Sequence, residues 1–221
     1  MGVTVNNNGS TIRIVSFDAE GTLASHAYSR SIWQEVVPAM YGELHGLAFE
    51  EAAERVFAEY ATIGPGRPEW YDIGYWFRRL GIGDPVPVLE AGRSTISFYP
   101  DVMPVLGALQ QQFVLVVASS TPEEFLRPLL RDVEGAFARM FSSTSSLGRL
   151  KDEAFYRWLC REMDAEPGEV VHIGDHLRRD YESASRAGLG ALYLDRTGQC
   201  STALHSLAGL LQYLGLAAID E

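Results

Sequence analysis

Short apolar runs recur along the chain and predict the strands of a parallel sheet. Residues 11–17 interleave isoleucine and phenylalanine with β-branched and short residues, and residues 113–118 form a continuous apolar run. Residues 169–173 and 190–194 are two shorter runs of the same kind. Continuous apolar runs are typical of parallel strands that are covered on both faces.

Segments with the period of a helix lie between these runs. Their apolar residues recur at three- and four-residue intervals, as on a helix with one buried face. The expected helices cover residues 101–111, 122–131, 152–163, 177–187 and 202–214. Strands that alternate with helices indicate βαβ units, so we expect an α/β fold with an open, Rossmann-like parallel sheet.

Residues 25–96 break the alternation, because they contain aromatic, helix-like stretches and no convincing strand. The helix-like stretches are 28–44, 49–61 and 68–80, and the Gly/Pro-rich breaks are 64–67 and 83–87. We therefore predict a discontinuous Rossmann-like core, residues 1–24 and 97–221, and an inserted all-helical cap, residues 25–96.

Composition narrows the class of protein. The 221 residues are 47% hydrophobic and carry a formal net charge of −11, which indicates a globular chain and argues against nucleic acid as a partner. The sequence has no apolar stretch of membrane-spanning length and no signal peptide at its N-terminus. Only Cys160 and Cys200 are present, at a spacing that fits neither zinc nor a disulfide framework. We expect a cytoplasmic protein with reduced cysteines and no membrane partner.

Polar side chains follow the predicted strands, where open α/β sheets bind their ligands. They are Asp18, Glu20 and Thr22 after the first strand, Ser119 and Ser120 after the second, and Asp175 and Asp180 after the third. Lys151, the only lysine, opens the helix before that last strand. Converging carboxylates would repel one another without a hard cation, and Mg²⁺ prefers oxygen ligands. A metal, a carboxylate nucleophile and phosphate-holding groups together suit phosphoryl transfer.

These motifs, in this order, resemble the haloacid dehalogenase (HAD) superfamily. The resemblance rests on Asp18-Ala19-Glu20-Gly21-Thr22-Leu23, the strand ending at Ser119, Lys151, and Gly174-Asp175 followed by Asp180. The resemblance covers roughly residues 11–215. Within the superfamily, the chain is similar to the subfamily with a helical cap between the first two motifs.

The resemblance implies a role for each of these positions. Asp18 would be the nucleophile that forms an aspartyl-phosphate, and its other oxygen would bind Mg²⁺. Lys151 would hold the nucleophile and the phosphate, and Glu20 would be the acid/base. The Mg²⁺ ligands would be Asp18, Glu20 through its backbone carbonyl, Asp175 and Asp180, with Asp180 either a ligand or a partner of one. On the substrate-binding side, Thr22 would brace the turn and Ser119 would bind the phosphate. Ser120 is the neighbouring candidate for phosphate binding if the strand ends one residue later.

Glu20 departs from the pattern, since phosphatases of the family normally carry Asp there. The additional methylene moves the carboxylate by about one bond length, and a misplacement of about 1 Å can cost roughly a hundredfold in rate. We expect a Mg²⁺-dependent phosphohydrolase of a small phosphorylated metabolite, acting as a monomer or homodimer. The alternatives are a 2-haloacid dehalogenase, which needs no metal, and a HAD-fold binding protein with little turnover.

Other polar and aromatic residues have plainer interpretations. Arg149 is the substitute for Lys151 if the loop register differs, His176 is expected to be a loop residue without a catalytic role, and His172 a satisfied core histidine. Five aromatic residues of the insertion are expected to form the cap core, with pocket lining as the alternative: Trp33, Trp70, Tyr71, Tyr75 and Trp76. Arg78 and Arg79 are expected on a solvated helix face.

Overall fold

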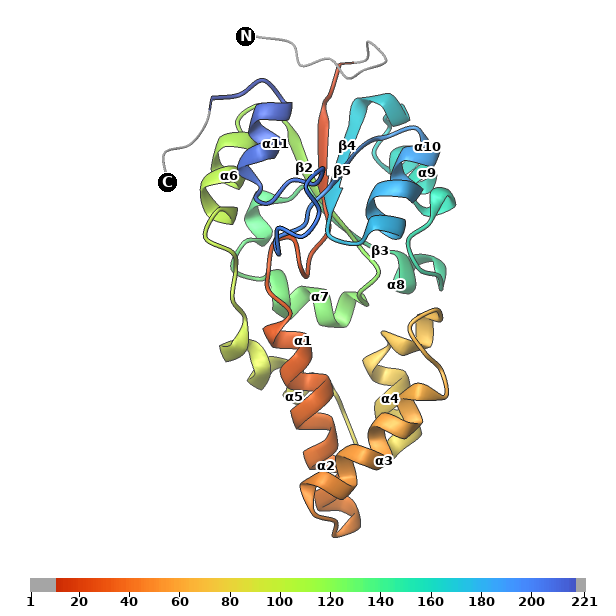
Figure 1. Ribbon diagram of the computed structural model, residues 1–221. Helices are drawn as coiled ribbons and strands as arrows, with labels where there is room; N and C mark the ends of the chain where they lie inside the picture. Colours follow the sequence, from red (N-terminus) through yellow and green to blue (C-terminus); the bar gives the residue numbers. More distant parts are fainter. Residues whose placement is uncertain (1–10, 218–221) are drawn as a thin grey trace.

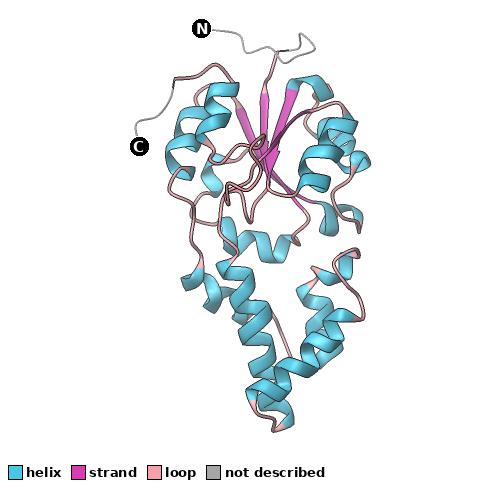
Figure 2. Cartoon of the chain, in the orientation of Figure 1, coloured by secondary structure: helices cyan, strands magenta, loops and turns pink. Residues whose placement is uncertain are grey.

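The computed structural model describes residues 11–217, and its centre is a sheet of parallel strands. The strands are β1 (Ile14–Phe17), β2 (Val114–Ser119), β3 (Arg139–Ser142), β4 (Val170–Gly174) and β5 (Gly190–Tyr193). Their order in the sheet is β3-β2-β1-β4-β5. β1 pairs with β2 from Ile14↔Val114 and with β4 from Ile14↔Val170, so the ends of all three strands meet at one edge. Figure 2 shows the strands as the centre of the larger lobe.

Helices cover both faces of this sheet. They are α6 (Val102–Leu109), α7 (Glu123–Leu130), α8 (Ser143–Leu147), α9 (Glu153–Glu162), α10 (Ser183–Ala187) and α11 (Ala208–Tyr213). Single turns connect them: η4 (Glu134–Ala136), η5 (Pro167–Glu169) and the π-helical η6 (Leu177–Glu182). In Figure 1, α6 and α11 lie on one side of the strands and α9 and α10 on the other.

Alternate residues of β1 enter two different apolar layers, as the period of a strand requires. Val15 and Phe17 pack in the layer that contains α6, α7 and α11. Ile14 packs in the layer that contains α9 and α10. This double coverage explains why the central strands are apolar at consecutive positions.

The chain between β1 and α6 is helical throughout its regular parts. Its elements are α1 (Ala27–Ser31), η1 (Ile32–Val36), α2 (Val37–His45), α3 (Phe49–Ala61), η2 (Pro68–Trp70), α4 (Ile73–Leu80), α5 (Val86–Gly92) and η3 (Arg93–Thr95). Figure 1 shows these helices as a narrow lobe beyond the carboxyl edge of the sheet. Apolar side chains of this lobe and of the sheet belong to one continuous cluster, so the inserted helices share a core with the layer beneath them.

The two chain segments that enter and leave the inserted helices run side by side. The backbone N–H of Ser25 donates to Ser97 O at 2.8 Å, and that of Tyr99 donates to Leu23 O at 3.1 Å. Arg196 fastens this crossing from the core, because it donates to Thr22 O at 2.7 Å and pairs with Asp101 at 3.0 Å. The inserted lobe therefore departs directly from the loop that follows β1.

The predicted elements are confirmed, with differences at their ends, whereas β3, α5 and α8 were not predicted. The four predicted strands correspond to β1, β2, β4 and β5. Edge strand β3 was not predicted, because its four residues begin with an exposed arginine and an intermediate methionine. The helix expected over 202–214 is confined to α11, and α5 begins in the break predicted at 83–87 and continues into residues for which no element was predicted. Within residues 11–217, no helix combines the length and the apolar character that crossing a membrane requires.

Candidate active site

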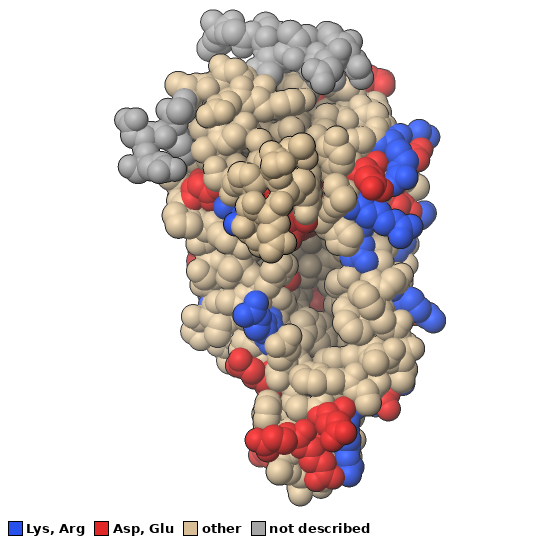
Figure 3. Space-filling model, viewed as in Figure 1, with Lys and Arg blue, Asp and Glu red and all other residues tan. Residues whose placement is uncertain are grey.

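The predicted polar residues gather at the carboxyl edge of the sheet, around a cavity of about 1120 Å³. Asp18 follows β1, Ser119 ends β2 and Asp175 follows β4, so three neighbouring strands bring them to one place. The inserted helices form the opposite wall of this cavity. Figure 3 shows the surface hollowed between the two lobes, with acidic atoms visible inside.

Asp18 and Lys151 form a buried ion pair at the base of the cavity. Lys151 Nζ donates to Asp18 Oδ1 at 2.5 Å and to the carbonyl of Ala118 at 3.1 Å. The Ser120 hydroxyl accepts from the backbone N–H of Lys151 at 3.1 Å and thereby fixes the start of this segment. Burial alone would lower the pKa of Lys151, but Asp18 and Asp180 raise it above its usual value, so the ammonium stays charged.

Asp18, Asp175 and Asp180 each offer a carboxylate oxygen within 4.8 Å of the others. Burial raises the pKa of Asp18, Lys151 opposes this, and the two neighbouring aspartates add to the increase, to a pKa of about 7. The three carboxylates share the single ammonium group of Lys151, and a divalent cation with oxygen ligands would offset their remaining negative charge. The donor set thus fits Mg²⁺.

Gly21 permits this close approach. A Cβ at Gly21 would lie 2.0 Å from Asp175 Oδ2, and Gly21 has a φ of +78°, where residues with side chains are strained. Glycine after Glu20 therefore serves both the turn and the packing of Asp175 against it.

Asp180 is fully buried, and described residues already occupy its oxygens. Its Oδ1 contacts Lys151 Nζ and lies 3.2 Å from His172 Nε2, while Oδ2 accepts from the His176 N–H at 2.9 Å. Burial would raise the pKa of Asp180, but Lys151 and His172 hold it well below its usual range. Of the two roles expected for Asp180, these contacts favour a partner that orients Lys151 over a direct metal ligand.

His172 is a satisfied core histidine, as the sequence predicts. It lies in β4 without exposed surface, and its Nδ1 is 2.9 Å from the Ser16 hydroxyl. Burial lowers its pKa, so the ring is neutral at pH 7. His172 therefore joins the sheet to Asp180 and Lys151.

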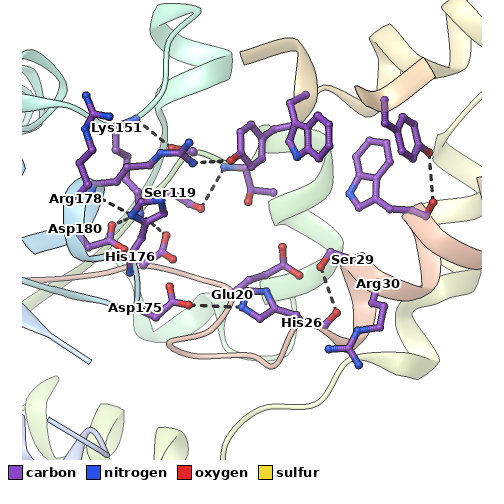
Figure 4. Close-up of a pocket in the computed structure, with 18 of the residues that line it drawn as sticks. Glu20, His26, Ser29, Arg30, Ser119, Lys151, Asp175, His176, Arg178 and Asp180 are labelled. Atoms are coloured by element: carbon purple, nitrogen blue, oxygen red, sulfur yellow. Dashed lines mark hydrogen bonds and ion pairs between the residues drawn. The ribbon is translucent and has the colours of Figure 1, made fainter. Parts of the chain in front are cut away.

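Glu20 lies in the same cavity but outside the three-carboxylate cluster. Its Oε1 is buried and has no hydrogen-bond partner among residues 11–217. Burial raises the pKa of its carboxyl, and Ser29 opposes this only in part. The side chain of Glu20 is therefore not part of the acidic cluster, since it projects past the turn toward Ser29 (Figure 4). A metal contact from Glu20 would have to come from its backbone carbonyl.

The three predicted substrate-binding hydroxyls occupy different environments. Ser119 and Ser120 line the cavity, and Ser119 Oγ accepts from the Thr121 N–H at 3.2 Å. Thr22 is fully buried and does not line the cavity, so the structure separates it from any substrate there. The side chain of Thr22 lies inside the protein, and its hydroxyl has no hydrogen-bond partner among residues 11–217, so no contact supports the expected bracing of the turn.

Several lining residues were not predicted from the sequence. His26 Nε2 lies 3.6 Å from Asp175 Oδ2, and that contact raises the pKa of His26 despite partial burial. Arg30 and Gln34 line the cap wall on the same helical stretch. Figure 4 shows Glu20, His26, Ser29 and Arg30 across the pocket from Ser119 and Asp180. The i, i+4 spacing of His26, Arg30 and Gln34 was a usable signal, but it does not show which face meets the cavity.

The inserted aromatic residues divide into two groups. Trp33, Trp70 and Tyr71 line the cavity, whereas Trp76 is fully buried. Tyr75 packs against Trp76 and does not line the cavity, so these two residues pack within the inserted helices, and the other three take the alternative position as pocket lining. Arg79 is held by Glu59 on the outer side, and neither Arg78 nor Arg79 lines the cavity.

The inserted helices and the sheet lobe are also joined beside the site. Arg179 of η6 donates to the Tyr71 hydroxyl at 2.6 Å and to Pro65 O at 2.7 Å. Its guanidinium lies 5.2 Å from the centre of the Tyr71 ring. His176, in the preceding loop, lines the cavity, although it was expected to be a plain loop residue and its side chain has no shown catalytic contact.

A parallel sheet with a buried nucleophile-like aspartate, a lysine and a carboxylate cluster at its carboxyl edge defines a hydrolase-type active site on a HAD fold. Residues 12–188 match the haloacid dehalogenase-like hydrolase family. The chain therefore belongs to that family and is a HAD-like hydrolase.

Curated relatives include two phosphatases of different description. The chain is 30% identical over 96 residues to a GMP/IMP nucleotidase of Escherichia coli, which covers 43% of this chain and 42% of that protein. It is 26% identical over 202 residues to a glyceraldehyde 3-phosphate phosphatase of Methanopyrus kandleri, covering 84% of each chain. The chain thus matches less than half the length of the nucleotidase.

Solved structures of both chemical types share the fold. A HAD phosphatase from Thermococcus onnurineus has a TM-score of 0.83 at 22% identity and covers 94% of this chain and 100% of its own. A 2-haloacid dehalogenase from Pseudomonas syringae has a TM-score of 0.66 at 22% identity, covering 93% and 99%. At this identity the likeness establishes the fold alone.

Proposed function

We propose that this protein hydrolyses phosphomonoesters with Asp18 as the nucleophile and with Mg²⁺ bound among the carboxylates. The observation that carries the proposal is the pairing of Asp18 with buried Lys151 beside Asp175, with Glu20 in the same cavity. The curated relatives named above are both phosphatases, which supports the same reaction class.

The metal would be held by Asp18 and Asp175, together with the backbone carbonyl of Glu20. Mg²⁺ usually takes one or two protein carboxylates and keeps its other positions for water and phosphate oxygens. When bound, it neutralises the phosphate and the carboxylates, which the raised pKa of Asp18 indicates is needed. Asp180 would keep Lys151 in place.

In the first step, an Asp18 carboxylate oxygen forms a bond to phosphorus as the ester P–O bond breaks. The ammonium of Lys151 and the Ser119 hydroxyl would hold phosphate oxygens during this transfer. Glu20 would give its proton to the departing alkoxide. Its raised pKa suits that task, because a carboxylic acid must keep its proton near neutral pH to act as a general acid.

In the second step, water attacks the phosphorus of the aspartyl-phosphate. Glu20, now a carboxylate, would accept the proton of that water, and the bond between Asp18 and phosphorus breaks to release inorganic phosphate. Splitting the displacement in two in this way is the ordinary benefit of a covalent intermediate.

Residues 25–96 would act as a cap that moves against a core made of residues 1–24 and 97–221. The paired segments at Ser25 and Ser97 provide the hinge, and the contacts of Arg179 with Tyr71 and Pro65 provide a closed position. Closure would exclude water from the phosphate and complete the pocket.

The test is release of p-nitrophenol from p-nitrophenyl phosphate by the purified protein. It is run with Mg²⁺ and with EDTA, beside Asp18→Asn and beside Arg186→Ala as a surface control. Activity that requires both Mg²⁺ and Asp18 and survives in Arg186→Ala supports the proposal. Activity unchanged by EDTA would contradict it, and chloride release from a 2-chloroacid under EDTA would identify a dehalogenase instead.

A further inference from the structure

The cavity that contains Asp18 and Ser119 is large, and many of the residues that line it are aromatic. Its volume of about 1120 Å³ exceeds what a phosphate with a few aliphatic atoms can fill, since drug-sized ligands occupy roughly 300–1,000 Å³. The wall opposite Asp18 carries aromatic side chains from three cap elements: Trp33, Phe57, Tyr60, Trp70 and Tyr71. We infer, on the basis of the proposed phosphatase activity, that the preferred substrate is a nucleoside monophosphate, whose base packs against this wall.

The aromatic wall is built and held in place by its own members. The ring of Trp33 packs edge-on against Tyr60, with centroids 5.8 Å apart, and lies parallel to Phe125 at 6.3 Å. Trp70 packs edge-on against the other side of Tyr60 at 6.2 Å. Because these rings fix one another, they present a preformed surface, and a second flat ring system can stack there without ordering mobile side chains.

Polar groups adjoin the aromatic surface where the edge of a base needs partners. Arg30, Trp33 and Gln34 are spaced at i, i+3 and i+4 along α1 and η1, and all three line the cavity. The side chains of Arg30 and Gln34 are exposed and have no hydrogen-bond partner within residues 11–217. An amide beside a stacking ring both donates and accepts, which matches the mixed edge of a heterocycle better than it matches an aliphatic chain.

Two arginine side chains that line the cavity carry positive charge without an ion-pair partner in the described part of the chain. Arg178 also lines the cavity and makes no ion pair within the described part of the chain. Arg179 is already engaged by Tyr71 and Pro65. Free guanidinium groups at Arg30 and Arg178 would attract a dianionic phosphate into a protein whose net charge is −11.

Two properties are measured to test this: the kcat/KM of the 221-residue protein with Mg²⁺, and ligand binding by calorimetry. The ligands are GMP, AMP and UMP, compared with glycerol 3-phosphate. We expect kcat/KM for at least one of these nucleotides to exceed that for glycerol 3-phosphate by about tenfold or more. Nucleotide binding is measured with Asp18→Asn, which should not turn the ligand over.

Variants separate stacking from folding. Trp33→Leu should lower kcat/KM for the nucleotide by about tenfold and change that for glycerol 3-phosphate by less than twofold. Trp158→Leu is the matched control, because Trp158 is a half-buried aromatic on the far side of the sheet, packed against Phe141. Gln34→Ala removes an exposed side chain, so its effect on nucleotide KM does not depend on the packing of Trp33.

Equal or better turnover of glycerol 3-phosphate than of every nucleotide would overturn the inference. So would a Trp33→Leu protein that folds and loses both activities equally. If the protein hydrolyses no phosphate ester, including p-nitrophenyl phosphate, the proposed function is wrong. In that case, the binding of nucleotides and of glycerol 3-phosphate to the wild-type protein tests the aromatic site separately. Nucleotide bound at least tenfold more tightly than glycerol 3-phosphate would still support the aromatic site, and equal binding would reject it.

Discussion

At the scale of single residues, the site concentrates charge on side chains that are largely buried. Asp18 and Asp180 share one ammonium group, that of Lys151, so one negative charge stays unbalanced inside the protein. The pKa of Asp18 responds by rising to about 7, and that of Asp180 falls. This imbalance favours cation and phosphate binding, and it also makes stability depend on pH.

Asp18→Asn should make the metal-free protein more stable at pH 8. The pKa of Asp18 is higher in the folded than in the unfolded chain, so the stability that its proton confers is present below about pH 4 and is lost as the pH rises through about 7. The rise from 3.8 to about 7 corresponds to about 4 kcal/mol. Loss of a partner for Lys151 offsets part of this, so we expect about 2 kcal/mol.

Urea unfolding in EDTA at pH 4.5 and pH 8 measures this difference. The two proteins should differ little in free energy of unfolding at the lower pH and clearly at the higher one. A difference that does not depend on pH would mean that Asp18 is not the group that titrates.

Glu20→Asp should increase kcat for p-nitrophenyl phosphate by about tenfold or more. The shorter side chain withdraws the carboxylate from Ser29 toward the position where the phosphate would lie, and misplacement by about 1 Å costs roughly a hundredfold. Glu20→Gln keeps the length but cannot exchange a proton, so it should lower kcat by about a hundredfold or more. Steady-state kinetics at saturating Mg²⁺ measure both. A fall in kcat for Glu20→Asp would mean that the cavity is shaped for glutamate.

At the scale of elements, η6 joins the site to the cap. Asp180 and Arg179 are adjacent in this turn, one facing Lys151 and the other bonded to Tyr71 and Pro65. A movement of the loop that contains Pro65 and Tyr71 would therefore act on Arg179, the residue next to Asp180. This short segment is thus one of the places where the sheet lobe and the inserted helices are in contact.

Arg179→Ala should lower kcat/KM by about fivefold to tenfold. A hydrogen bond from a charged group contributes about 1.5–3 kcal/mol, and part of that is lost to solvent at this half-exposed position. Arg186→Ala is the control, since Arg186 pairs with Glu182 on the surface of the following helix. Kinetics with p-nitrophenyl phosphate distinguish them, and equal losses in both variants would show that the contacts with the cap are not used.

The sequence predicts the strands that carry the motif residues better than it predicts how the inserted helices pack around the cavity. Asp18, Ser119 and Asp175 could be placed together because parallel strands end at one edge, whatever their packing. The separation of Trp33 from Trp76 could not be foreseen, because both lie in apolar helical stretches. Which of them faces the cavity depends on how the cap helices pack on one another, and periodicity does not give that.

At the scale of the whole molecule, the carboxylates lie between two lobes that share a core. Binding at this junction should therefore stabilise the entire fold. Mg²⁺ at about one hundred times its dissociation constant adds about 2.7 kcal/mol. For a chain of this length that amounts to a rise in Tm of roughly 5–10 °C.

We expect Mg²⁺ to raise the Tm of the wild-type protein by this amount and to raise the Tm of Asp175→Asn little or not at all. Scanning calorimetry in EDTA and in Mg²⁺ measures it, with Asp132→Asn as a control at an exposed carboxylate of the core. An equal rise in all three proteins would locate the metal elsewhere.

Lys151 is the only lysine in the chain, and its side chain is 3% exposed. An endoprotease that cuts after lysine therefore has one target, the bond between Lys151 and Asp152, which lies within the site itself. Digestion of the native protein should be slow and should give two fragments, 1–151 and 152–221. Its rate would report the openings that expose Lys151, so protection by a metal or a nucleotide could be followed on a gel without any label.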